Sequence, residues 1–259
     1  MLGSPHLVVT AIVIVGLSVL AALLVLGLVR RAIPHNRLTP HNEVSGFVYA
    51  AIGVIYAVIL GFVVISVWEQ YSDAESNARQ EADAVGNLYR LADGLPPPSR
   101  QAMQGAALDY ATAVVNEEWP AMADGTPVSQ RQINQLNALW STLYTVEVTT
   151  PREEQLYAAT IDQMDALSGH RRERLEDADT GLLGIMWAVM IVGGMLTVLF
   201  PCLFGVENGL VHALIIGTLA AAIGLLLFTV YELDHPFQGD VHVQPDGFEL
   251  VLEQFGAAS

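Results

Sequence analysis

The residues best suited to chemistry in this 259-residue chain are histidines and carboxylates near its C-terminus. His235 and His242 lie in a turn-rich segment with Asp234 and Asp240. Imidazole and carboxylate groups are the usual protein ligands of divalent cations. The two aspartates are therefore candidate ion-binding residues, although exposed loop residues give the same pattern and no metal is indicated by it.

Three more carboxylates are candidates within the predicted helices. Glu81 lies in a long helical pattern, and Glu117 and Glu118 directly precede Trp119. We include Glu81 as a candidate ion-binding residue. The simpler interpretation of each acid is a solvated helix surface, because the segment 69–179 is strongly acidic throughout.

Motifs for catalysis are missing from the sequence. It contains no phosphate-cradling glycine-rich loop and no HExxH, CxxC or GxSxG motif. A single cysteine, Cys202, permits no intrachain disulfide. The formal net charge of −16, with arginine as the only basic residue type besides histidine, argues against nucleic-acid binding. We expect neither an enzyme nor a nucleic-acid partner, and no cofactor apart from a possible calcium ion.

Composition points to a membrane protein. Hydrophobic residues make up 53% of the chain and charged residues 15%, with a mean hydropathy of +0.43, whereas soluble domains carry about 25% charged residues. Four apolar runs, at about 7–29, 47–68, 182–204 and 210–231, have the roughly 20 residues that a spanning helix needs. The sequence therefore predicts an all-α polytopic membrane protein with four transmembrane helices.

The spacing of these runs predicts four parts. They are a transmembrane hairpin at 1–68, an extramembrane helical bundle at 69–180 that continues span 2, a second hairpin at 181–231 and an acidic tail at 232–259.

Within the bundle, apolar stripes predict that span 2 continues to about Ala92 and that helices follow at about 99–118, 129–146 and 152–177. Trp119–Pro120 is expected to end the first of these. Pro34 and Pro40 are expected to keep the connector after the first span from being helical.

The second span carries a stripe of small residues on one predicted face. Small faces let transmembrane helices approach closely, so helix packing is one interpretation and the lining of a conduction path is the other. The residues of this face are Gly46, Ala50, Gly53, Ala57 and Gly61, with Tyr49 and Tyr56 beside it.

Several segments read together resemble the bestrophin-like family of bacterial and plant membrane proteins of unassigned function. They are HNEVSGFVYAAIGVIYAVILGF, WEQY, NEEWPAM, RRERL and LDHPFQGDVHVQP, and the resemblance covers nearly the whole chain. The residues that carry it include Asn42, Trp68, Glu118, Trp119, Pro120, Arg172, Arg174, Pro236, Phe237 and Gly239.

This resemblance implies a distant relation to bestrophins, which are ligand-gated, chloride-conducting oligomeric channels. Their second span lines the pore, and an acidic calcium-binding run follows a Pro-Phe-Gly. Here Gln238 precedes Gly239 and the acids that follow are sparse, which argues against calcium gating. Ile59, Phe62 and Ser66 only partly match the apolar pore neck.

We therefore expect a homo-oligomeric ion channel or channel-like protein, with span 2 near the axis and the helical bundle as gate or vestibule. Its partners would be the lipid bilayer, other copies of the chain and small inorganic ions, with cations favoured if the acids flank a vestibule. The alternative is a membrane-anchored sensor or scaffold whose bundle binds a protein or ligand. We expect a multi-pass protein of the cell membrane, and arginine counting leaves the side of the bundle open.

Overall fold

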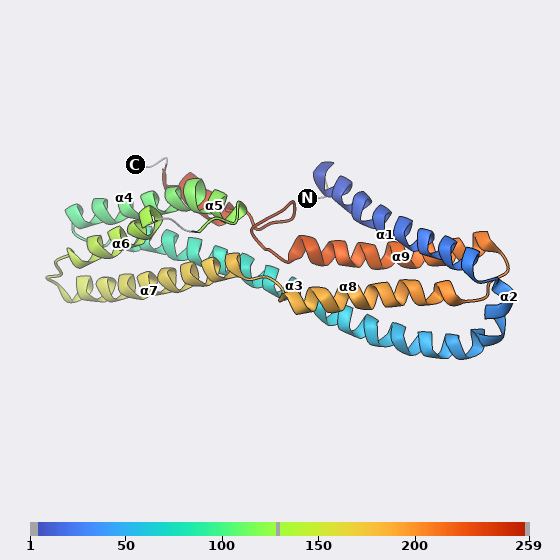
Figure 1. Cartoon of the computed structure of the whole chain (residues 1–259). Coiled ribbons are helices and arrows are strands. Elements are labelled where there is room, and N and C mark those ends of the chain that lie inside the picture. The colour runs from blue at the N-terminus through green and yellow to red at the C-terminus, as the bar shows by residue number, and fades with distance from the viewer. Residues whose placement is uncertain (1–4, 128–129, 257–259) are drawn as a thin grey trace. The chain divides into compact units, whose positions relative to one another are not determined.

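The computed structural model describes residues 5–127 and 130–256, without the side chains of residues 130–132. These residues form helices and contain no strand, which confirms the predicted all-α class (Figure 1). The helices are α1 (Pro5–Ala32), α2 (His35–Leu38), η1 (Thr39–His41), α3 (Asn42–Ala92), α4 (Pro97–Ala113), η2 (Val114–Glu118), α5 (Trp119–Ala123), α6 (Gln130–Tyr144), α7 (Pro151–Asp179), α8 (Gly184–Leu199), η3 (Phe200–Leu203), α9 (Gly209–Leu233) and α10 (Asp246–Gly256).

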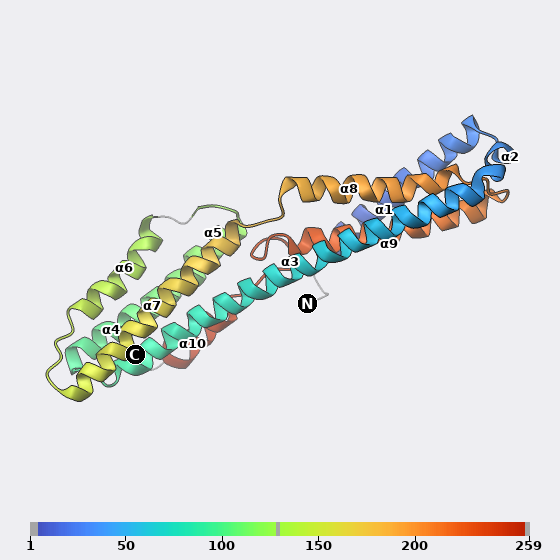
Figure 2. The same cartoon turned by 90° about the horizontal axis from the view of Figure 1, so that it is seen from below.

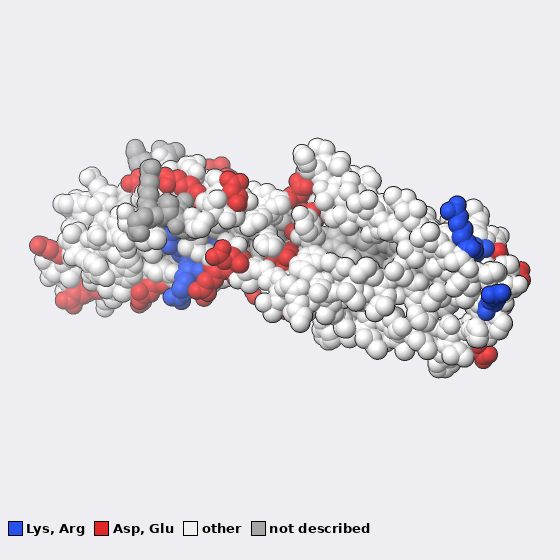
Figure 3. Space-filling model, in the orientation of Figure 1, with Lys and Arg blue, Asp and Glu red and all other residues white. Residues whose placement is uncertain are grey.

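The chain divides into two compact units. We call Met1–Glu69 with Gly181–Asp234 the membrane unit, and Gln70–Thr180 with His235–Ser259 the helical unit, in each case for their described residues. Four helical segments of the described chain are long and apolar enough to cross a membrane, as predicted: Pro5–Ala32, His35–Ala92, Gly184–Leu203 and Gly209–Leu233. Figure 3 shows that, on the face in view, the surface of the membrane unit carries charged residues mainly near its ends.

Close helix packing in the membrane unit depends on small residues. A Cβ on Gly224 of α9 would lie 3.1 Å from Ser18 Oγ of α1, so the two backbones approach closely there. Tyr56 of α3 lies against α8, where a Cβ on Gly193 would come within 2.6 Å of the tyrosine ring. The Tyr56 hydroxyl donates to the carbonyl of Met190 at 3.1 Å. These contacts give each span its neighbours within the protomer.

The connector after α1 was predicted wrongly as non-helical. It contains α2 and η1, because both prolines stand where a helical turn tolerates them: Pro34 precedes α2 and Pro40 lies in the first turn of η1.

The helical unit has one apolar core. The predicted stripe after the span is present, with Ala74, Ala78, Val85 and Leu88 of α3 all buried. Figure 2 shows α4 and α7 beside this part of α3, with α6 on their far side, and α10 also lies against α3. The C-terminal segment thus contributes Phe248 and other side chains of α10 to this core.

The helix that was predicted to end at Trp119–Pro120 does not end there. It continues from α4 through the π-helical turn η2 into α5 and ends at Ala123. Pro120 lies at the start of α5, directly after the π-helical turn, and donates no backbone hydrogen bond there.

Candidate functional site

Four charged side chains are buried together inside the helical unit. Glu81 comes from α3, Glu118 from η2, and Arg171 and Arg174 from α7. Their exposed fractions are 0%, 1%, 7% and 0% in that order. Charged residues are almost never this buried unless they are paired. We call these four residues the buried charge cluster.

Arg174 lies at the centre of the cluster. Its Nε donates to Glu81 Oε2 at 2.6 Å, and its Nη2 donates to Glu81 Oε1 at 3.0 Å, which makes a bidentate pair. The same Nη2 donates to Glu118 Oε2 at 2.6 Å. Arg171 Nη2 donates to the other oxygen of Glu118 at 2.8 Å. Two carboxylates and two guanidinium groups therefore neutralise each other inside the helical unit.

Neutral side chains complete the surroundings of the cluster. The Tyr110 hydroxyl donates to Glu81 Oε1 at 2.6 Å, and Arg174 Nη1 contacts the Met122 sulfur at 3.3 Å. The Arg174 guanidinium carbon lies 5.2 Å from the centre of the Trp119 ring, within cation–π range.

Helical periodicity explains how α7 delivers its two arginines. Met164, Leu167, Arg171 and Arg174 follow each other at intervals of three or four residues, so they share one face of the helix. All four are buried. The face that packs into the core thus carries its two cations at its C-terminal end.

Glu118 reaches the cluster through a local irregularity. It is the last residue of the π-helical turn Val114–Glu118. Such a turn holds one extra residue, which rotates everything after it by about 100° relative to an uninterrupted α-helix. Glu118 and Trp119 both face the interior as a result, with 1% and 6% of their surface exposed.

The C-terminal segment docks on Trp119. The indole Nε1 donates to the carbonyl of Val243 at 3.0 Å, and the ring makes edge contacts with Phe237 at 5.5 Å and Phe248 at 5.9 Å. Gly239 adopts φ +76°, a left-handed conformation that suits glycine, in the turn closed by the Val243 N–H donating to the Pro236 carbonyl. The NEEWPAM and HPFQG segments therefore meet in space.

Burial and neighbouring charges shift the pKa values of Tyr110 and Arg174. Burial, reinforced by the Glu81 carboxylate, raises the pKa of Tyr110 well above its usual range, so this phenol stays a hydrogen-bond donor. Burial alone would lower the pKa of Arg174, but the adjacent Glu81 and Glu118 carboxylates raise it above its usual value. Arg174 thus stays charged and Tyr110 stays a donor at neutral pH, which suits positioning of helices rather than proton transfer.

The structure separates residues that the sequence analysis grouped. Arg172, chosen with Arg174 as a motif residue, is 71% exposed at its side chain and lies 4.0 Å from Glu176. Arg171 occupies the cluster instead. The signal that identifies Arg171 is its three- or four-residue spacing from Leu167 and Arg174. Tyr110 likewise belongs to the site, although no sequence pattern indicated a chemical role for it.

The three candidate ion-binding residues lie in different surroundings. Both Glu81 oxygens already accept hydrogen bonds in the buried charge cluster. Asp234 Oδ1 accepts from the Leu182 N–H at 2.6 Å, and its Oδ2 accepts from Trp187 Nε1 at 3.1 Å. Asp240 is exposed. Within residues 5–127 and 130–256, no group of three or more His, Cys, Asp or Glu residues is arranged to hold a metal ion, and ion binding at these positions stays a prediction.

The membrane half of α3 has three distinct faces. Its buried face, Tyr56, Leu60, Val63 and Val67, packs inside the protomer, and Tyr49 continues it by stacking on Phe200 at 6.1 Å. At about 100° per residue, the predicted small-residue face lies about a quarter turn to one side of this buried face, and Ile59, Phe62 and Ser66 lie about a quarter turn to the other.

Neither flanking face is buried against other described residues of the protomer. A Cβ built on Gly46, Gly53 or Gly61 would meet nothing within 4 Å, and Ala50 and Ala57 are exposed. Phe62 is 70% exposed. Within the described part of the chain, the small-residue face therefore has room for a packing partner.

The remaining motif residues have unequal roles. Asn42 joins the start of α3 to the turn before α9, because its Oδ1 accepts from the Gly205 N–H at 2.8 Å and its Nδ2 donates to the Gly205 carbonyl at 3.2 Å. Trp68 is 61% exposed, and Pro120 is also exposed. Neither of these two contributes to the buried charge cluster.

Comparison with known proteins identifies a family and solved structures that this chain resembles. A family model described as the Bestrophin-like domain matches residues 16–248. A crystal structure of a mutated bacterial bestrophin homologue from Klebsiella pneumoniae shares 12% identity, with a TM-score of 0.71 over 93% of this chain and 99% of that chain. The structure of that homologue phased by Zn-SAD shares 13% identity, with a TM-score of 0.69 over 93% of this chain and 98% of that one.

These likenesses show a common fold. A search among curated proteins finds no match. The family model covers most of the chain, including the motif segments that build the buried charge cluster, and the chain therefore belongs to the bestrophin-like domain family of membrane proteins.

Proposed function

We propose that this membrane protein is the subunit of a homo-oligomeric ion channel, with α3 near the symmetry axis. The observation that carries the proposal is the division of the α3 span into one face used by its own protomer and two faces that are not. A helix that lines an axis in a ring of subunits needs just such surfaces: one for its own protomer, one for a neighbour and one for the pore. Membership of the bestrophin-like family supports the same function.

The small-residue face is assigned to the neighbouring subunit. Glycine and alanine at Gly46, Ala50, Gly53, Ala57 and Gly61 permit close helix approach, and in lipid such packing is a main source of association energy. The face formed by Ile59, Phe62 and Ser66 is then the one turned to the axis. It offers a largely apolar lining, of the kind that gates by dewetting.

We assign the helical unit the role of gate or vestibule. Charge favours cations over chloride here, because the chain carries 27 acidic and 11 basic residues. The conducting form would reside in the plasma membrane, and the protein would catalyse no reaction.

Calcium is not required in this proposal. Asp234 would have to give up hydrogen bonds to Leu182 and Trp187 to bind an ion, and Glu81 those to Arg174 and Tyr110. Flux that is unchanged by a calcium chelator is the expected result, whereas flux that appears only on adding calcium would contradict this part of the proposal.

Reconstitution tests the function. The full-length protein is purified, its oligomeric mass is measured in detergent, and it is incorporated into liposomes for potassium and chloride flux. We expect a ring-sized oligomer and a potassium flux that exceeds the chloride flux. A stable monomer or dimer without flux of either ion would refute the channel and favour a membrane-anchored sensor or scaffold.

A matched pair of variants tests the assigned interface. Gly53→Leu places a bulky side chain on the small-residue face, where the protomer itself has room for it. Val58→Leu, at a position that is 53% exposed and lies about a quarter turn from the centre of the small-residue face, enlarges a different face. We expect loss of the oligomer for Gly53→Leu and its retention for Val58→Leu. Equal masses for the two variants would contradict the assignment.

A further inference from the structure

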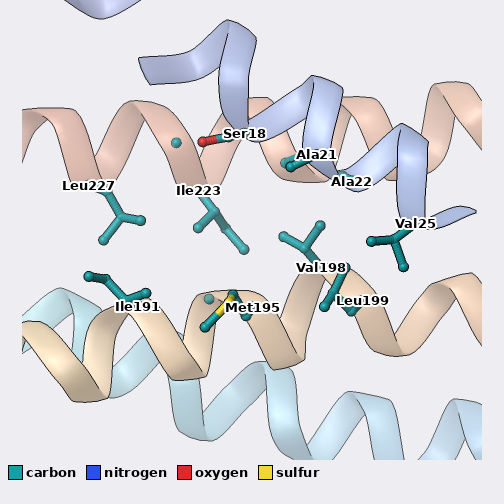
Figure 4. Close-up of a pocket in the computed structure, with 13 residues that line it drawn as sticks. Ser18, Ala21, Ala22, Val25, Ile191, Met195, Val198, Leu199, Ile223 and Leu227 are labelled. Carbon is teal, nitrogen blue, oxygen red and sulfur yellow. The ribbon is translucent and has the colours of Figure 1, made fainter. Parts of the chain in front are cut away.

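The membrane unit contains an apolar cavity of about 350 Å³ between α1, α8 and α9. Figure 4 shows side chains of all three helices converging on it, including Ala21 and Val25 from α1, Val198 from α8 and Ile223 from α9. Ser18 is the only labelled side chain there that carries an oxygen. The cavity is of the size of many ligand pockets.

Water is a poor occupant of this cavity. A buried water needs two to four polar partners. The Ser18 hydroxyl already donates to the Ile14 carbonyl at 2.8 Å within α1. The other lining side chains are apolar, and backbone groups inside helices are engaged in the helices' own hydrogen bonds. An empty cavity would cost the lining atoms their dispersion contacts. An apolar molecule is therefore the chemically matched occupant.

The position of the cavity identifies that molecule. Its lining on α9 runs from Ala220 to Leu227, about 10 Å along the helix axis. This length fits within one leaflet of a hydrocarbon core about 30 Å thick. On α8, Ile191 and Met195 both line the cavity and are 47% and 49% exposed, so the cavity opens on the side of the spans that faces outward from the unit. Its lining is continuous there with the lipid-facing surface.

We infer that this cavity binds one acyl chain of a bilayer phospholipid, which enters past Ile191 and Met195 and lies along α9. The site lies on α1, α8 and α9 and not on the exposed faces of α3, so it can be tested without measuring ion conduction. The acyl chain fills the space that the small residues of α1 and α9 leave open.

Photolabelling in a bilayer tests this site. The full-length protein is reconstituted with a phosphatidylcholine that carries a diazirine midway along one acyl chain, irradiated and mapped by mass spectrometry. Ala22, Val198 and Ile223 line the cavity but are only 2%, 9% and 8% exposed, so lipid outside the cavity cannot reach them. We expect label on these three residues.

Two sets of residues serve as internal controls. Leu17 and Leu24 are 60% exposed and should be labelled by surrounding lipid. Leu60 and Val63 are buried in the same unit but do not line the cavity, and should stay unlabelled. Label on Leu17 and Leu24 without label on Ala22, Val198 and Ile223 would overturn the inference. It would indicate an empty cavity or one filled by a second copy of the chain.

A matched pair of variants gives a second test. Ala21→Phe projects a ring into the cavity and should abolish the labelling of Ile223. Leu24→Phe enlarges an exposed position of α1 that does not line the cavity, and should leave that labelling unchanged. Unchanged labelling of Ile223 in a folded Ala21→Phe protein would contradict the inference. If that variant does not fold, the wild-type labelling pattern alone decides.

Discussion

Replacing Arg174 by methionine should destabilise the helical unit far more than the same replacement two residues away. Methionine keeps an unbranched apolar stem but removes the guanidinium that binds Glu81 and Glu118 at 2.6 Å each. Two buried carboxylates are then left with Arg171 and the Tyr110 hydroxyl as partners. Removing one partner of a buried ion pair costs about 3–5 kcal/mol, and we expect a loss in this range.

Arg172→Met is the matched control on the same helix. The Arg172 side chain is 71% exposed and its carboxylate partner, Glu176, is 4.0 Å away. Exposed pairs of this kind contribute about 0–1 kcal/mol. Urea unfolding of the full-length protein in detergent measures both losses, followed by tryptophan fluorescence, to which Trp119 beside the cluster contributes. Free energies of unfolding that differ by less than about 1 kcal/mol would refute the reasoning.

Replacing the whole buried charge cluster separates the contribution of charge pairing to stability from that of packing. The variant Glu81→Gln, Glu118→Gln, Arg171→Met, Arg174→Met leaves no uncompensated charge inside. It should therefore be more stable than Arg174→Met alone, because apolar or neutral replacement of a complete buried ion network is often tolerated. Equal or lower stability would mean that shape, not charge balance, governs the site.

Three further predictions concern single positions. The pKa of Tyr110 is raised in the folded state, so the stability that the neutral phenol contributes is complete below the unfolded-state pKa of about 10 and is lost as pH rises towards the folded-state pKa. Tyr110→Phe should reduce this alkaline loss of stability in pH-dependent unfolding. An unaltered pH profile would contradict the role of the Tyr110 hydroxyl as a buried donor. Phe248→Ala should cost about 3–5 kcal/mol because this ring is 1% exposed against Trp119, whereas Leu250→Ala on the same helix, 62% exposed, should be nearly neutral in the same urea titration. Gly205→Ala should cost about 1–3 kcal/mol in thermal unfolding, because its Cβ would meet Thr39 and the His35 carbonyl. Gly27→Ala, whose Cβ would meet nothing within 4 Å, should have no such effect, and equal losses would show that the close approach is not the cause.

The spacing of apolar residues was sufficient to predict most of the helices and many of the core residues. The apolar runs predict the four spans, and the stripe from Ala74 to Leu88 predicts the side of α3 that is buried. The same rule applied to α7 would have identified Arg171, because it continues the spacing of Met164 and Leu167. The choice of Arg172 followed the motif instead of the helix face.

Other features have no comparable signal in the sequence. The π-helical turn at Val114–Glu118 differs from an α-helix in its hydrogen-bond register, which residue types do not encode, so its effect on Glu118 and Trp119 was not foreseeable. The small residues of α3 predict close packing but not the partner. Among the described residues of the protomer no such partner lies against this face, since Tyr56 and Leu60 make the internal contact and a Cβ built on Gly53 would meet nothing within 4 Å.

The most direct test of the central proposal is thiol modification of α3 during ion flux. With Cys202 replaced by alanine, Phe62→Cys and Ser66→Cys place a thiol on the face assigned to the axis, and Leu60→Cys places one on the buried face, where the native side chain is 4% exposed. A hydrophilic methanethiosulfonate reagent is added to liposomes that contain each variant. The proposal predicts that the reagent blocks potassium flux at positions 62 and 66 and leaves it unchanged at position 60. Flux that is insensitive to modification at both Phe62→Cys and Ser66→Cys would contradict a conduction path along this face.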